Sequence, residues 1–249
     1  MSWLMNIVGL QLLAWALGMT VTVVLFDSAA GFVRDHPPHA WRAAGILAGP
    51  LALVSFACLL HCSAPLWLSL GVVLPFALMA SAYSWAWFHR TPAETRRRLG
   101  RQAMIMGLIT VLFVSLQLGS EPQAALVLAA FAGSAALLGG LGTLCLVALM
   151  GGRHDEVEVP FSPYGMPARI IATGLGITLL ALLDGGLGSL EGLLVLPVRL
   201  WIAFSLLIPL ALVAAGHRLF PRWQPPIWTG AFGSVLVGQM ALHAALILS

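Results

Sequence analysis

The chain has very few charged side chains, no lysine and only three cysteines among its 249 residues. Charged residues make up 8% of the sequence and hydrophobic residues 60%. About a quarter of a soluble domain is charged, so a water-soluble core does not fit this composition. Because there is no lysine, a photoreceptor that holds retinal as a lysine Schiff base is excluded. The cysteines (Cys58, Cys62 and Cys145) have no CxxC spacing, so they predict neither a zinc site nor a disulfide framework.

Long apolar runs fill the sequence instead. Roughly 20 apolar residues cross the hydrocarbon layer as a helix, and runs of this length recur throughout the chain. The first run is too long, and has too few basic residues ahead of it, for a cleaved signal peptide, so we expect a retained helix. We predict an all-α integral membrane protein with a single polytopic transmembrane domain over residues 1–249. Its eight predicted helices cover residues 3–26, 40–60, 65–88, 102–119, 123–150, 168–187, 192–216 and 226–247.

The basic residues divide the predicted connections into two groups. All are arginines, and 11 of the 12 lie in the first, third, fifth and seventh connections. The positive-inside rule places these connections in the cytoplasm and both termini on the outer side, as in a multi-pass protein of the bacterial inner membrane. The high pI then reflects topology and not nucleic-acid binding. The densest run, in residues 91–102, is interpreted as an anchor that binds anionic lipid headgroups.

Polar side chains gather at the outer ends of six predicted helices. Ionisable groups within a membrane are costly and are a functional hypothesis by default. The inner halves of the predicted helices carry mainly serine and threonine. We therefore expect a polar cluster on the outer side of the bundle. Its predicted members are Asn6, Gln11, His61, Gln117, Glu121, Asp184, Glu191, Arg199, Gln239 and His243.

His61 ends the second predicted helix, in the segment LLHCSAPL (59–66). One interpretation is an interfacial residue that caps the helix and contacts lipid headgroups. The other is a hydrogen-bond partner for a ligand at the outer edge of the bilayer. A neutral imidazole can accept a hydroxyl proton and pass it to water, which is the proton transfer that quinol oxidation requires.

Arg199 lies inside the seventh predicted helix, close in predicted depth to Asp184 and Glu191. It either snorkels toward the outer headgroups or pairs with a carboxylate to shape a pocket, where the carboxylates would also provide a proton path. His243 is predicted at the depth of His61. The two histidines then belong either to a quinol site or to the axial ligand pair of a b-type haem. The sequence predicts no other metal site.

The segment LLHCSAPLWLSL (59–70), with eight helices and outward termini, resembles the membrane-anchor subunit of the dimethyl sulfoxide reductase family. In that family the second helix ends in Leu-His-Leu-Gly-Ser-Pro. Leu60, His61 and Pro65 match position for position, a serine stands one place early, and a cysteine and an alanine depart from the pattern. The resemblance in helix number and topology covers nearly the whole chain, whereas the resemblance in the motif covers about six residues.

The resemblance implies a subunit without a metal of its own. Such a subunit holds an iron–sulfur electron-transfer subunit and a molybdopterin catalytic subunit at the membrane. It passes them electrons from menaquinol or ubiquinol, and His61 is the residue carried over as the quinol contact. The residues themselves leave open a transporter or channel, a non-catalytic assembly scaffold and a haem-b subunit. A transporter would require polar residues through the full bilayer, which the inner halves hardly provide.

Overall fold

The computed structural model describes residues 2–29, 39–61, 65–118, 123–150, 170–178, 199–212 and 224–248. Within these ranges every regular element is a helix, as predicted. Residues 170–178 and Arg199–Leu212 are also helical, and the second of these contains the π-helical η2. The elements are α1 (Ser2–Ala29), α2 (His39–Leu60), α3 (Leu66–Leu68), the π-helical η1 (Ser69–Val73), α4 (Leu74–Phe88), α5 (Ala93–Leu118), α6 (Gln123–Met150), η2 (Ile202–Leu207) and α10 (Gln224–Leu248).

Five helical stretches in the described ranges are long and apolar enough to cross a membrane. This supports a multi-pass membrane protein. The predicted helices 168–187 and 192–216 fall only partly on described residues, so the count of eight stays a prediction. The five spans are Leu4–Ser28, Trp41–Leu60, Leu66–Phe88, Ala93–Leu118 and Val127–Leu146.

The start of α5 corrects the predicted boundary. The prediction began this helix at residue 102, whereas it begins at Ala93, directly after Pro92. The intervening residues are mostly arginine, glutamate, alanine and leucine, which are good helix formers even where they are charged. Four arginines that the prediction assigned to a connection therefore lie on the helix. Whether their side chains point into the bundle or away from it depends on the rotation of α5 about its axis. By contrast, α6 coincides with the predicted range 123–150.

Two prolines explain the π-helical segments. Proline lacks an N–H and its ring clashes with the carbonyl four residues earlier, so the preceding turn widens. Pro75 lies four residues after Gly71 in the middle of η1. Pro209 lies four residues after Ser205 in η2. Both helices continue beyond their proline, so neither is broken there.

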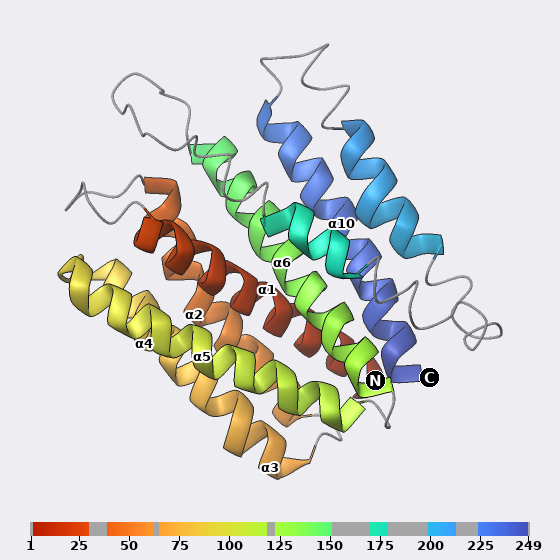
Figure 1. The fold of residues 1–249 in the computed structure, drawn as a ribbon, viewed down its shortest axis with the longest axis horizontal. Helices are drawn as coiled ribbons and strands as arrows, with labels where there is room; N and C mark the ends of the chain where they lie inside the picture. Colours follow the sequence, from red (N-terminus) through yellow and green to blue (C-terminus); the bar gives the residue numbers. More distant parts are fainter. Residues whose placement is uncertain are drawn as a thin grey trace.

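The centre of the bundle is formed by α1 and α6. Both have 78% of their span buried, against 39–44% for the other three spans. They lie between α2–α5 on one side and the C-terminal helices on the other (Figure 1). Where they cross, the backbone of Gly18 packs directly on Ala135 and Gly139. Small residues allow this close approach between helices in a membrane.

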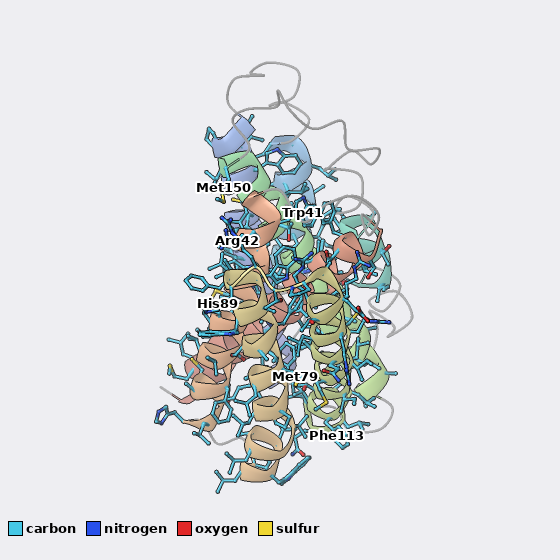
Figure 2. The ribbon with its side chains drawn as sticks, turned by 90° about the vertical axis from the view of Figure 1, so that its left-hand side faces the viewer. Trp41, Arg42, Met79, His89, Phe113 and Met150 are labelled. Atoms are coloured by element: carbon cyan, nitrogen blue, oxygen red, sulfur yellow. The ribbon has the colours of Figure 1, made fainter. Side chains whose placement is uncertain are left out.

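The bundle has two distinguishable ends. The first turn of α1 and the last turn of α10 lie at one end, the terminal end (Figure 1). The α4–α5 turn and the first turns of α5 lie at the opposite end, the arginine end. Trp41 and Arg42 at the start of α2 lie toward the arginine end, and Phe113 lies toward the terminal end (Figure 2).

Candidate functional site

A buried group of polar side chains surrounds the inner face of α10. We name Gln11, Ser134, Ser205, Gln239 and His243 the polar column. The hydroxyl of Ser134 donates to Oε1 of Gln239, and Nε2 of Gln239 donates to Oγ of Ser205 over 3.3 Å. All five side chains are buried. Because a buried amide is costly unless it is hydrogen-bonded, these bonds hold the Gln239 side chain in one orientation.

His243 lies one helical turn beyond Gln239 and is fully buried. Its ring stacks on Phe131 of α6, with the ring centroids 5.5 Å apart and an angle of 29° between the planes. Neither ring nitrogen has a hydrogen-bond partner in the described part of the chain. An imidazole in this position can accept a proton or a hydrogen bond from a group that the described residues do not supply.

Gln11 of the column and the neighbouring Trp201 add further buried donor and acceptor groups. Nε2 of Gln11 in α1 donates to the carbonyl of Leu236 over 3.3 Å, while its Oε1 has no partner among the described residues. The indole Nε1 of buried Trp201 likewise has no partner there. The helix Arg199–Leu212 runs antiparallel to α10 (Figure 1), and Ser205 pairs with Gln239. Trp201, four residues before Ser205, therefore lies near the level of His243, four residues after Gln239. Donor and acceptor groups therefore occur together at this depth.

The local sequence explains how Ser205 reaches Gln239. The wide turn before Pro209 contains Ser205, and the residue facing it on α10 is Gly238. A Cβ atom at Gly238 would collide with Oγ of Ser205 and lie 3.0 Å from its backbone nitrogen. The absence of a side chain at Gly238 thus lets the two helices approach closely enough for the hydrogen bond from Gln239.

The predicted site residues separate in the structure. His61 directly follows α2, its backbone N–H donates to the carbonyl of Ala57 over 3.2 Å, and its side chain is exposed. Arg199 is exposed, although its helix neighbours α10, which carries the buried His243. The structure therefore does not bring His61 or Arg199 onto the imidazole of His243. Asp184 and Glu191 lie outside the described residues.

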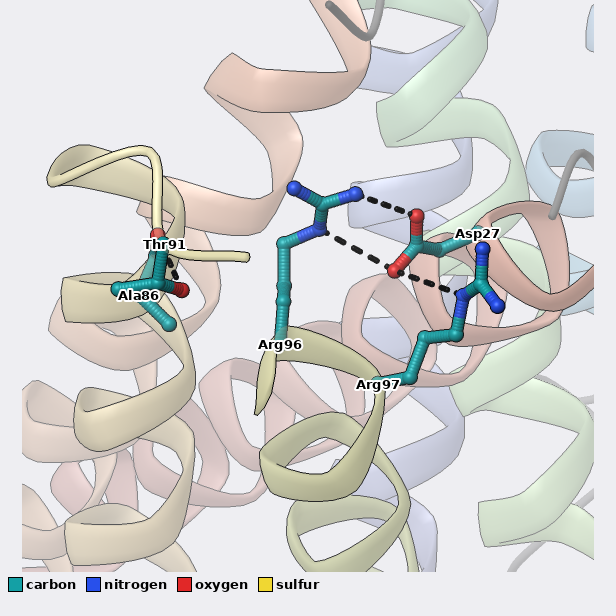
Figure 3. Close-up of polar contacts among 5 residues, drawn as sticks. All are labelled: Asp27, Ala86, Thr91, Arg96 and Arg97. Carbon is teal, nitrogen blue, oxygen red and sulfur yellow. Dashed lines mark hydrogen bonds and ion pairs between the residues drawn. The ribbon is translucent and has the colours of Figure 1, made fainter. Parts of the chain in front are cut away.

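A second buried polar group lies at the arginine end. Arg96 of α5 binds Asp27 of α1 through two hydrogen bonds, Nη2 to Oδ1 over 2.7 Å and Nε to Oδ2 over 3.2 Å (Figure 3). The exposed fraction is 4% for Arg96 and 7% for Asp27. Arg97 also contacts Oδ2 of Asp27, at 4.0 Å. A bidentate arginine–carboxylate pair with this burial holds α1 and α5 in a defined register.

Aromatic side chains surround this ion pair. The guanidinium of Arg96 lies 4.3 Å from the ring centroid of Trp87, a cation–π contact. The ring of Tyr83 packs edge-on against Trp87, with 6.2 Å between centroids. Next to them, Nη2 of Arg42 donates to the carbonyl of Phe88 over 2.8 Å. Arg42 thus satisfies a backbone carbonyl at the end of α4, where the helix itself provides no partner.

The ion pair corrects the interpretation of the arginine run. Arg96 was expected to contact lipid headgroups from a connection, whereas it lies on α5 and faces the bundle interior. Asp27 was missed altogether. Its sequence signal is a single carboxylate at the end of the first apolar run, on the side predicted to carry the arginines. Ser134 and Ser205 were also missed, because the sequence does not show whether a serine in an apolar helix faces the bundle interior or the lipid.

Among the described residues, no three histidine, cysteine, aspartate or glutamate side chains come together as a metal site would require. The polar column instead offers hydrogen-bonding groups, a buried imidazole and an aromatic wall. Comparisons with protein-family models, with curated proteins and with solved structures give no match to the chain.

Proposed function

We propose that the chain is a membrane subunit of a respiratory oxidoreductase that binds quinol or quinone in the polar column. The observation that carries the proposal is the imidazole of His243, buried on Phe131 without a hydrogen-bond partner among the described residues. A quinol needs an acceptor for its hydroxyl proton and an apolar wall for its ring. His243 and Phe131 supply these two features side by side.

Each group has a role in the proposed chemistry. Oxidation of a quinol to a quinone releases two electrons and two protons. His243 accepts a hydroxyl proton, while Gln239, held by Ser134 and Ser205, orients the ligand through its amide. The two protons leave one after the other by way of His243, and His61, which is exposed after the end of α2, passes them on to water in this proposal. The electrons leave to an iron–sulfur partner subunit, and from there to a molybdopterin catalytic subunit.

The finer topology belongs to the same proposal. The chain crosses the bacterial inner membrane eight times, with both termini and the polar column toward the outer face. Two observations support this arrangement. The start of α1 and the end of α10 lie at the same end of the bundle, and the exposed Arg90, Arg98 and Arg101 belong to the opposite end (Figure 1). The bound substrate is then menaquinol or ubiquinol, and Asp184 and Glu191 remain candidates for its proton path.

Binding of a quinone analogue to the purified protein tests the proposal. Replacing His243 with leucine keeps the bulk of the side chain and removes both ring nitrogens. We expect the analogue to bind about five- to thirtyfold more weakly to His243→Leu, because a hydrogen bond in a buried site contributes about 1–2 kcal/mol. His243→Gln, which retains a hydrogen-bonding group, should keep part of the affinity.

The exposed His89 at the arginine end provides the matched control. His89→Ala should bind the analogue as tightly as the parent protein. Thermal unfolding of each variant in detergent reports whether it is folded. A folded His243→Leu variant with parental affinity for the analogue would exclude His243 as the ligand contact and remove the main support for the proposal.

The Asp27–Arg96 pair favours a second candidate, a transporter. A solute pathway requires polar groups at both ends of the bundle, and this pair adds buried charge at the arginine end, opposite the polar column. Uptake of solute into liposomes that contain the chain alone distinguishes the two functions. A quinol-binding subunit requires its redox partners for activity, whereas a transporter acts without them.

A further inference from the structure

The outward face of α5 changes from charged to apolar along one line. Exposed positions recur at intervals of four and three residues, the spacing of a single helix face. Its first three members are charged and its last three are aliphatic. We name this face the α5 stripe, and it consists of Glu94, Arg98, Arg101, Ile105, Leu108 and Leu112.

The two arginines of the stripe differ from their neighbour Arg96. Arg96 faces the interior and is bound to Asp27, whereas Arg98 and Arg101 are exposed. Neither Arg98 nor Arg101 forms an ion pair with any residue that the structure describes. Glu94, one turn from Arg98, is the single carboxylate of the stripe. The stripe therefore keeps a net positive charge of one (two arginines and one glutamate).

The length of the apolar part matches one leaflet of a membrane. Arg101 and Leu112 are 11 residues apart, which is about 16 Å along a helix. Half of a ~30 Å hydrocarbon layer is about 15 Å. When the arginines lie at the headgroup level, the aliphatic side chains follow the acyl chains to the bilayer midplane. Ile105 and Leu108 are more than half exposed, as lipid contact requires.

We infer that the α5 stripe is a binding site for an anionic phospholipid, with the phosphate on Arg98 and Arg101 and an acyl chain along Ile105, Leu108 and Leu112. Arginine is suited to this role because its planar guanidinium binds phosphate oxygens through two parallel hydrogen bonds. The spacing of three residues places both guanidinium groups on one side of the helix. This site is separate from the polar column and does not depend on the proposed function.

Native mass spectrometry and thermal unfolding of the detergent-purified full chain test the site. Phosphatidylglycerol should bind and raise the unfolding temperature, whereas phosphatidylcholine with the same acyl chains should do neither at equal concentration. Arg98→Gln and Arg101→Gln should each weaken phosphatidylglycerol binding about fivefold, the ratio that ~1 kcal/mol per arginine near an anionic surface gives. Added salt should reduce the difference between the two lipids.

Arg90→Gln is the matched control, because it removes the same charge from an exposed side chain that lies in the α4–α5 turn and is not part of the stripe. It should change the affinity less than twofold. Inorganic phosphate and glycerol phosphate separate a lipid site from a phosphate site. Equal stabilisation by either of these would overturn the lipid assignment. Unchanged phosphatidylglycerol affinity in the folded Arg98→Gln, Arg101→Gln double variant would overturn the site itself.

Discussion

At the scale of single residues, the charge of Asp27 is the most constrained in the described part of the chain. It lies within the first span and accepts two hydrogen bonds from Arg96, with Arg97 4.0 Å away. Removing one partner from a buried ion pair leaves a desolvated charge, which is far more costly than replacing both partners. The pair therefore makes α1 and α5 depend on each other.

Asp27→Asn should destabilise the protein strongly, by about 3–5 kcal/mol, because Arg96 would stay buried without its counter-charge. The double variant Asp27→Leu, Arg96→Met should recover much of the loss, since it leaves no unpaired buried charge. Reversible unfolding in mixed detergent micelles measures both. Equal stability of Asp27→Asn and the parent protein would show that the pair contributes nothing to folding.

At the scale of helices, the contact between α1 and α6 depends on two glycines. A Cβ atom on Gly18 would overlap the carbonyl of Ala135 and lie 2.9 Å from Cα of Gly139. Because the obstacle is backbone, no change of side-chain rotamer can relieve it. The two most buried of the five described spans thus meet where two glycines face each other.

Gly18→Ala should separate these helices and cost about 1–3 kcal/mol of stability, the range for overpacking in a close-packed interior. Gly233→Ala in α10 is the control, because nothing lies within 4 Å of a Cβ atom there. The control should gain slightly, since alanine favours a helix by about 1 kcal/mol over glycine. Unfolding of both variants in the same detergent measures the difference. The expectation fails if Gly18→Ala is as stable as Gly233→Ala.

At the scale of the whole molecule, exposed arginines of α5 and the α4–α5 turn gather at one end of the described bundle. The arginine end contains Arg90, Arg98 and Arg101 as exposed cations, while the start of α1 and the end of α10 lie opposite (Figure 1). Because cytoplasmic connections are rich in arginine, the proposed orientation puts the arginine end in the cytoplasm. In that orientation the polar column lies toward the outer face.

Reporter fusions measure this orientation. Alkaline phosphatase fused after residue 249 should be active and green fluorescent protein there should be dark, because the first folds only outside and the second only inside. Fusions after Thr91 in the α4–α5 turn should give the opposite result. Fluorescence at the C-terminus would place the terminal end in the cytoplasm and reverse the proposed orientation.

Much of the helical layout could be predicted from the sequence. Helix α6 has its predicted bounds, and α1, α2, the span Leu66–Phe88 and α10 lie within three residues of theirs. Apolar length is a local property, and a lipid environment forces the backbone to satisfy its hydrogen bonds within each segment. The error at α5 has a local cause as well, since hydropathy marks where the hydrocarbon ends and not where the helix does.

The candidate site could be predicted from the sequence only in part. Gln11, Gln239 and His243 were predicted as polar residues at one end, while their burial and partners were not. Asp27 and Arg96 are 69 positions apart, and Ser134 and Gln239 are 105 apart. The direction of a polar side chain depends on the rotation of its helix and on the neighbours across the interface. Composition and the length of the apolar runs thus determined an all-helical fold with helices long enough to cross a membrane. Only packing decided which polar groups turn inward, because burial is a property of two surfaces in contact.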